Sequence, residues 1–185
     1  MRVIGIDPGT ICSGYGIVEV GSKKLKVRGK NPNFSFPTSD FSLLTYIASG
    51  EIKMNKRDTL PERLKLFYNS LKAIIHEYSP SHLCIEKIFY HKSIISAFAL
   101  GSIRGIAMLL AAENNIQVFE YNSTELKMAL TGYGRAEKRQ VKEMVIRILQ
   151  FDKLTAGLSR SFSEDITDAL ALCICHIHHN TGYRR

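Results

Sequence analysis

The 185-residue chain lacks the sequence features that mark several large protein classes. No two of its four cysteines, Cys12, Cys84, Cys173 and Cys175, have the Cys-x-x-Cys spacing of common zinc and redox sites. We interpret them as reduced thiols of an intracellular protein. A zinc site built from the cysteines and histidines of 173–179 is an alternative, but alternating positions on a helix point apart, which disfavours it.

Secretory and membrane signals are also missing. The chain begins with an apolar, strand-like run at Arg2, so we expect no signal peptide. Its longest apolar segment, residues 94–112, contains Arg104, two glycines and two serines, which favours a buried helix over a membrane span. We find no internal repeat, low-complexity segment or second domain, and therefore expect one domain over residues 1–185.

Acidic residues are outnumbered, because 17 Asp and Glu stand against 25 Lys and Arg, which gives a net charge of +8 at pH 7. This excess favours a polyanionic partner, nucleic acid first and an anionic membrane surface second, although many basic proteins bind neither. Hydrophobic residues make up 45% of the chain, which is enough for a sizeable core and favours a folded chain.

Hydrophobic periodicity predicts an α/β protein. It predicts strands at 2–6, 15–20, 82–85 and 117–121, with 25–28 and 43–52 as further candidates. It predicts helices at 59–77, 93–114, 123–130, 137–149 and 163–178. Tight turns should join the opening strands in antiparallel pairs, and the strands separated by helices should pair in parallel. We expect a mixed five-stranded sheet with helices on both faces.

Two predicted strands end on a single carboxylate. Residues 4–10 read Ile-Gly-Ile-Asp-Pro-Gly-Thr, so an apolar run ends on Asp7 and turns at once. Such a turn occurs where an aspartate binds a metal, and also in actin-like proteins, which hold the phosphates of ATP but need a second phosphate loop and a second lobe. The run at 82–85 ends similarly on Glu86. An isolated acid there often just begins a loop, but neighbouring strands would bring these two together.

Two further acids, Asp165 and Asp168, lie three residues apart on one face of the last predicted helix. Acids at a helix start are favoured by the helix dipole alone, but Asp168 stands among residues that prefer burial. Four carboxylates at the ends of buried elements repel one another and need a counter-charge. Oxygen ligands favour Mg²⁺ or Mn²⁺, and two such ions can promote phosphodiester hydrolysis. The pattern therefore predicts a metal-dependent nuclease.

Six motifs resemble, in order and spacing, the RuvC-type Holliday-junction resolvases, which have the ribonuclease-H-like fold. The motifs are GIDPGT…GYGIVEV, LPERLKLFYNSL, CIEKIFYHKSIISAFALGSIRGIAMLLAA, VFEY, GRAEKRQVKEMV and DITDALALCICHIH. The resemblance covers nearly the whole chain. It implies a homodimeric, Mg²⁺-dependent endonuclease that binds four-way DNA junctions and makes paired, symmetric nicks with ligatable ends.

The resemblance also implies roles for single residues. The four acidic ligands fall on Asp7, Glu86, Asp165 and Asp168, the catalytic lysine on Lys138 and a base-stacking aromatic residue on Phe89. Glu164 competes with Asp165 for the role of ligand, but the three-residue spacing to Asp168 favours Asp165. In this mechanism the carboxylates hold two Mg²⁺ ions, and Lys138 neutralises developing charge or helps orient the water.

Basic and aromatic residues near these acids are candidates for DNA contacts. If its helix extends back to Arg135, one basic stripe is formed by Arg135, Lys138, Arg139 and Lys142, which suits phosphate contacts or mere solvation. The predicted loop after Glu86 carries Phe89, Tyr90 and Lys92, whose rings could stack on unpaired bases or fold back on the core. Lysines and an arginine of 23–30 either grip a DNA arm or protect an edge strand.

Gly101 and Gly105 lie one turn apart in the helix at 93–114, where each glycine costs roughly 1 kcal/mol. Their presence indicates the close approach of another element. This is either packing on the sheet or a dimer contact, and the resemblance favours the dimer.

Two features depart from the bacterial members of the family, namely an insertion near 31–50 and an early end after the last helix. Both resemble the poxvirus branch, whose enzymes process viral replication intermediates, so we predict that branch and a location in the host-cell cytoplasm, or otherwise a cytoplasmic one. The alternatives are a ribonuclease-H-like RNA-processing nuclease, a junction-binding protein without catalysis, and an actin-like ATP-binding protein.

Overall fold

A computed structural model describes residues 1–21, 43–87, 94–151 and 162–180. The strands are β1 (Arg2–Asp7), β2 (Cys12–Gly21), β3 (Leu43–Lys53), β4 (His82–Glu86) and β5 (Gln117–Tyr121). The helices are α1 (Leu60–Tyr78), α2 (Ile94–Glu113), α3 (Ser123–Thr131), α4 (Lys138–Ile148) and α6 (Glu164–Asn180). The predicted helices and the four firmly predicted strands are therefore confirmed to within a few residues.

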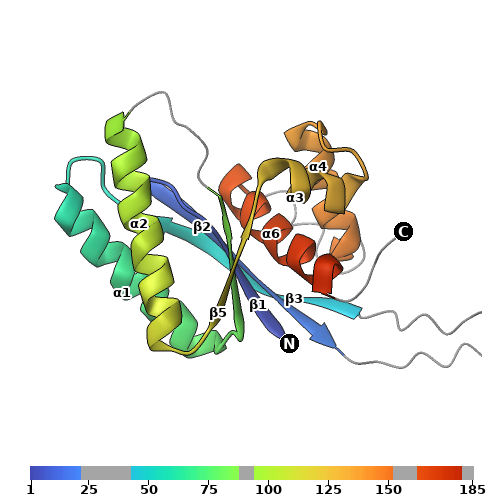
Figure 1. Ribbon diagram of the computed structural model, residues 1–185, viewed down its shortest axis with the longest axis horizontal. Coiled ribbons are helices and arrows are strands. Elements are labelled where there is room, and N and C mark those ends of the chain that lie inside the picture. The colour runs from blue at the N-terminus through green and yellow to red at the C-terminus, as the bar shows by residue number, and fades with distance from the viewer. Residues whose placement is uncertain (22–42, 88–93, 152–161, 181–185) are drawn as a thin grey trace, which may run out of the picture.

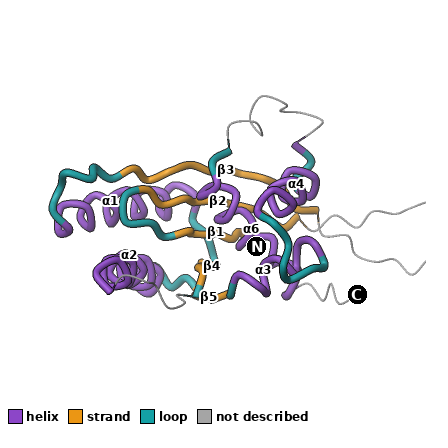
Figure 2. Tube along the Cα trace, turned by 90° about the horizontal axis from the view of Figure 1, so that it is seen from above, coloured by secondary structure: helices purple, strands orange, loops and turns teal. Residues whose placement is uncertain are grey.

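The strands form one sheet in the order β3-β2-β1-β4-β5, which Figure 2 shows from above. The β1–β2 and β2–β3 pairs are antiparallel, whereas β1–β4 and β4–β5 are parallel. Figure 1 shows α1 and α2 on one side of the sheet and α3, α4 and α6 on the other. The expected mixed five-stranded sheet with helices on both faces is confirmed.

Strand β3 confirms the candidate strand at 43–52. A tight turn joins β1 to β2, and residues 22–42 separate β2 from β3 in the chain. β3 pairs with β2 along its whole length, from Cys12↔Lys53 to Gly21↔Leu43. Residues 43–50 of the expected insertion therefore belong to the sheet, and the insertion near 31–50 stays a prediction. Its residues 31–42 and the candidate strand 25–28 lie outside the described part.

Local sequence explains where the helices start. The Thr59 N–H donates to the Glu62 carboxylate at 2.8 Å, and Pro61 occupies the first turn of α1. Helix α3 is capped by Asn122, whose side chain accepts the Glu125 N–H at 2.8 Å.

Glycines let α6 lie directly on the sheet. A Cβ added to Gly14 would stand 2.1 Å from the Asp165 carbonyl oxygen, and one added to Gly5 would stand 2.0 Å from that of Ala169. Neither position can hold a side chain without moving the helix. The first turns of α6 are thus pressed against β2 and β1 at the end where β1 finishes.

Each face of the sheet has its own apolar core. One core includes Phe67 and Leu71 of α1 with Ile103 and Leu110 of α2, and the other is built around α6. Helix α2 is long and apolar enough to cross a membrane by length and composition alone. Its buried residues, such as Ile103, fill the first core, but only 28% of the apolar window is buried, so the expected burial is confirmed for one face of the helix only.

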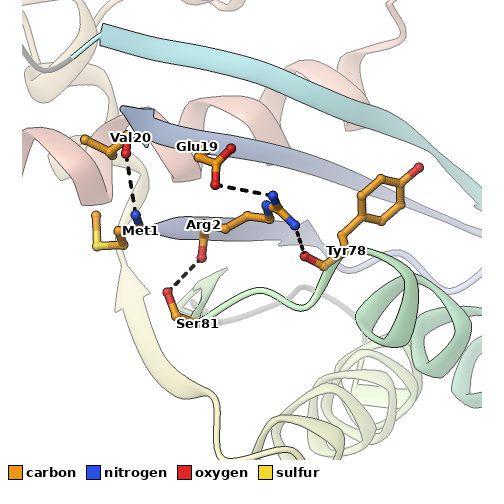
Figure 3. A network of polar contacts seen from close by, with 6 residues as sticks. All are labelled: Met1, Arg2, Glu19, Val20, Tyr78 and Ser81. Carbon is orange, nitrogen blue, oxygen red and sulfur yellow. Dashed lines mark hydrogen bonds and ion pairs between the residues drawn. The ribbon is translucent and has the colours of Figure 1, made fainter. Parts of the chain in front are cut away.

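Polar contacts close the end of the sheet opposite Asp7 (Figure 3). The Arg2 guanidinium donates to the Tyr78 carbonyl at 2.5 Å and to Glu19 at 3.3 Å, and the Ser81 hydroxyl donates to the Arg2 carbonyl at 3.1 Å. Near this end His176 of α6 is fully buried and lies 2.8 Å from the His82 ring nitrogen and 2.7 Å from the Tyr121 hydroxyl. These contacts join the strands to α1 and α6, and through Tyr121, which pairs with Glu86 across β4 and β5, they extend to the acidic end.

Candidate active site

The carboxylates of the sheet lie in one row across its strands. Asp7 pairs with Gly14 across β1 and β2, and Gly14 pairs in turn with Glu51 of β3. On the other side, β1 and β4 are in register up to Ile6↔Ile85, so Asp7 and Glu86 leave adjacent strands at the same end. The sequence prediction that these two acids share a sheet edge is consistent with this register.

The turn after Asp7 is held in place by several hydrogen bonds. The buried Ser13 hydroxyl lies 3.1 Å from both the N–H and the carbonyl of Gly9, and the Arg63 guanidinium donates to the Thr10 carbonyl at 2.5 Å. The chain therefore leaves the sheet immediately after Asp7. This geometry leaves the carboxylate at the strand end, facing α6.

Helix α6 brings two more acids over the same row. The Asp165 backbone lies on Gly14, which stands between Asp7 and Glu51, and Asp168 follows one turn later. The electrostatic field of both acids reaches Asp7, and that of Asp168 reaches Glu86. The four carboxylates predicted from the sequence thus come together in the fold.

The charges of these acids are only partly compensated by neighbouring lysines. Burial, followed by the charges of Asp168, Asp165 and Glu86, raises the pKa of Asp7 to about 8. Burial also raises the pKa of Glu86 and of Asp168, although Lys138 opposes both shifts. The group of acids is therefore short of positive charge at neutral pH.

Lys138 lies at the first position of α4 and contacts the start of α6. Its Nζ is 2.6 Å from Glu164 and 3.8 Å from Asp168. The hydrogen bond to Glu164 raises the pKa of Lys138, so the lysine stays charged. Glu164 is mostly exposed and pairs with this lysine, which favours Asp165 over Glu164 as the acid that belongs to the carboxylate row.

Sequence reasoning missed three residues of the site. The charge of Lys127 on α3 lies close enough to oppose the rise in the pKa of Glu86 and of Asp168, and its only sequence signal was its place on the helix after β5. The Cys12 thiol donates a hydrogen bond to Asp165, and the ligand atoms of Cys12, Glu51 and Asp165 lie within 4.8 Å of one another. No spacing rule links these three positions, because only the pairing of β2 with β3 brings them together.

The basic stripe differs from its prediction. Helix α4 begins at Lys138 with Glu137 as its N-cap, so Arg135 lies in the preceding turn rather than on the helix face. Lys142 donates to the Phe162 carbonyl at 2.5 Å, and Arg139 is exposed and 3.9 Å from Glu143. Arg135, Lys138 and Arg139 are therefore exposed, whereas Lys142 is only partly exposed. The candidate DNA contacts Phe89, Tyr90 and Lys92 lie outside the described residues.

Arg104 of α2 supports the end of β4 from the opposite face. Its guanidinium donates to the Glu86 carbonyl and forms a 2.7 Å ion pair with Glu120 of β5. The Arg104 side chain is only 12% exposed, so this charge is largely removed from water. The contact ties the backbone that carries Glu86 to the neighbouring strand.

The donor set at this site fits a hard divalent cation. The acids Asp7, Glu86, Asp165 and Asp168 offer only oxygen atoms, and the raised pKa of Asp7 indicates a group that favours a counter-charge. Within the described ranges, the cysteines and histidines of 173–179 form no group with metal-ligand spacing. Cys173 Sγ instead lies 3.3 Å from the Gly16 carbonyl, which disfavours the zinc alternative.

Comparison with known proteins identifies the family. The family model described as crossover junction endodeoxyribonuclease RuvC matches residues 36–176. The RuvC endonuclease of Legionella pneumophila is 36% identical over 97% of this chain and 88% of its own length. That of Caldanaerobacter subterraneus is 36% identical over 100% of this chain and 97% of its own.

Solved structures agree with the fold. Thermus thermophilus RuvC superimposes with a TM-score of 0.77 at 24% identity, covering 98% of this chain and 97% of its own. Fowlpox virus resolvase, solved with Holliday junction DNA, gives 0.55 at 16% identity over 97% of this chain and 99% of its own. The curated relatives above are bacterial, so the predicted poxvirus branch finds no support. The chain belongs to the RuvC family of crossover junction endodeoxyribonucleases.

Proposed function

We propose that this chain is a structure-selective endonuclease that resolves four-way DNA junctions by paired, symmetric nicks through two-metal-ion hydrolysis. The observation that carries the proposal is the row of strand-end carboxylates Asp7 and Glu86 under Asp165 and Asp168, with Lys138 beside it. The names of the relatives and the complex of T. thermophilus RuvC with a Holliday junction substrate support the choice of DNA junctions.

The position of each residue in the site supports a separate proposed role. Asp7, Glu86, Asp165 and Asp168 would hold Mg²⁺, or Mn²⁺ in its place, which when bound supplies Lewis acidity at the scissile phosphate. Lys138 and Lys127 lie near these acids and would stabilise negative charge that develops on the phosphate. Arg135 and Arg139 stand exposed beside them and would contact neighbouring phosphates.

Paired nicks need two sites, and α2 offers a surface for a second copy of the chain. A Cβ added to Gly101 or Gly105 would meet nothing within 4 Å, so these glycines do not pack on the sheet. Ile95 and Phe98 on the same helix are 83% and 73% exposed. Arg104, the basic residue of the helix, is turned towards Glu120. We infer that this uncharged face forms the homodimer.

The dimer inference predicts that Phe98→Glu yields a monomer in sedimentation equilibrium, because a charge would enter the apolar contact. Leu66→Glu is the matched control, since Leu66 is exposed on α1. If both variants contain the same fraction of dimer, α2 does not form the dimer contact.

We propose an intracellular, cytoplasmic location, which the four free cysteines support. The proposed setting is DNA recombination. The bacterial relatives give no reason to propose the processing of viral intermediates.

The deciding experiment compares a synthetic four-way junction with a linear duplex and an RNA–DNA hybrid, each with Mg²⁺, and maps the cuts on every strand. We expect symmetric nicks in two opposing strands of the junction only. Asp7→Asn should abolish cleavage and leave junction binding largely intact. Preferential cutting of the hybrid would favour the RNA-processing alternative, and binding without cleavage would favour a non-catalytic junction protein.

A further inference from the structure

The turn between α3 and α4 has a tightly held backbone. The Thr131 hydroxyl lies 2.8 Å from the Lys127 carbonyl and 3.1 Å from the Tyr133 N–H. Gly132 adopts a left-handed φ of 73°, and a Cβ added to Gly134 would stand 2.8 Å from Thr124. The Ala136 N–H donates to the Tyr133 carbonyl at 3.1 Å. These contacts fix the direction in which residue 133 leaves the turn.

The side chain at that position is a large ring in water. Tyr133 is 58% exposed although its N–H and carbonyl are both bonded within the turn. Among the described residues, the exposed large hydrophobic residues include one other aromatic side chain, Phe98, which belongs to the proposed dimer face. Because the backbone of this turn is already fixed, the binding of a partner to the exposed ring costs less conformational entropy than binding to a flexible loop.

The surroundings of Tyr133 favour a polyanion. The turn joins Lys127 to Lys138, which both act on the carboxylate row, and it carries the exposed Arg135. Its acidic residue, Glu137, is the N-cap of α4, and its N–H donates to the Gln140 side chain at 2.9 Å. Tyr133 and Lys138 are five positions apart in the chain, so their Cα atoms lie within about 18 Å of each other, which is roughly five base steps along a DNA strand.

We propose that Tyr133 stacks on a base of the DNA strand that approaches the carboxylate row, while Arg135 contacts its phosphate. This role rests on the proposed junction nuclease, and it adds a contact that positions the strand. Aromatic stacking is tolerant of sequence and loses about tenfold in affinity per base when the ring is removed. The phosphate contact contributes the salt-dependent part of the affinity.

The test measures junction affinity in the cleavage-deficient Asp7→Asn protein, with 2-aminopurine placed at successive positions near the cut site. Tyr133→Ala and Tyr133→Leu should each weaken binding about tenfold and abolish the fluorescence change at one position. Tyr133→Phe should stay within about twofold of the parent, because the ring is retained. Leu66→Ala on α1 is the matched exposed control and should leave affinity unchanged.

Salt dependence separates stacking from a general loss of structure. Tyr133→Ala should keep the slope of log affinity against log salt, whereas Arg135→Gln should reduce it by about one unit. Parental affinity in Tyr133→Ala, or Tyr133→Phe as weak as Tyr133→Ala, would overturn the stacking proposal. A parent protein that does not bind junctions would instead overturn the proposed function itself, so the two failures are distinguishable.

Discussion

Replacement of Asp7 by asparagine should stabilise the metal-free protein while it abolishes cleavage. The pKa of Asp7 rises from 3.8 to about 8 on folding, because of burial and then the charges of Asp168, Asp165 and Glu86. The folded state therefore holds this proton more tightly than the unfolded state. Stability from this group is complete below pH 3.8 and is lost as the pH rises towards 8.

Linkage sets the size of the effect. For these two pKa values, the titration of Asp7 lowers the free energy of unfolding by less than about 1 kcal/mol at pH 4 and by at most about 4 kcal/mol at pH 7. Neighbouring carboxylates can take up protons in place of Asp7, so we expect Asp7→Asn to gain about 1–3 kcal/mol at pH 7. The neutral amide retains most of the shape of the carboxyl group without its charge.

The assay is urea unfolding followed by circular dichroism at pH 4 and pH 7, in chelator and in Mg²⁺. Without metal, Asp7→Asn should exceed the parent at pH 7 and match it at pH 4. With Mg²⁺ at about 100 times its dissociation constant, the parent should gain about 2.7 kcal/mol and the variant much less. If the variant is more stable than the parent by the same free energy at pH 4 and pH 7, the electrostatic argument is refuted. It is also refuted if Mg²⁺ raises the free energy of unfolding of the two proteins equally.

Three further predictions concern other parts of the fold. Gly14→Ala would place a Cβ 2.1 Å from the Asp165 carbonyl oxygen, so it should lower the free energy of unfolding by about 1–3 kcal/mol and weaken Mg²⁺ binding in calorimetry. Gly105→Ala, whose Cβ meets nothing, is the control and should not destabilise the monomer. Arg104→Met should cost about 2–3 kcal/mol in urea unfolding, because it leaves Glu120 and the Glu86 carbonyl without their partner, whereas Glu120→Gln should cost less; equal losses would contradict this. Burial, followed by His82 and His179, lowers the pKa of His176 to about 4, so its contribution to stability is present above pH 6.5 and should be lost as the pH falls to about 4. The difference in unfolding free energy between the parent and His176→Gln should shrink by about 2–3 kcal/mol between pH 7 and pH 4, and a constant difference would exclude the role of His176.

Some of the site was predictable because it is marked by local patterns. An apolar run that ends on one acid identified Asp7 and Glu86, and three-residue spacing on a helix identified Asp165 and Asp168. The helix starts were predicted to within one residue, but the basic stripe depended on an extension of α4 back to Arg135. Helix α4 begins at Lys138 with Glu137 as its N-cap, so Arg135 lies before the helix.

The sequence by itself predicted the helices and strands and the fold class, and it singled out the four acids as candidates. This was possible because hydrophobic periodicity and turns are properties of consecutive residues. Tertiary structure alone decided which acids are neighbours and how they are charged. Glu51 joins the row only because β3 pairs with β2, and Asp165 lies over it only because Gly14 has no side chain. The raised pKa of Asp7 follows from burial and three converging charges, which are distant in the chain and close only in the fold.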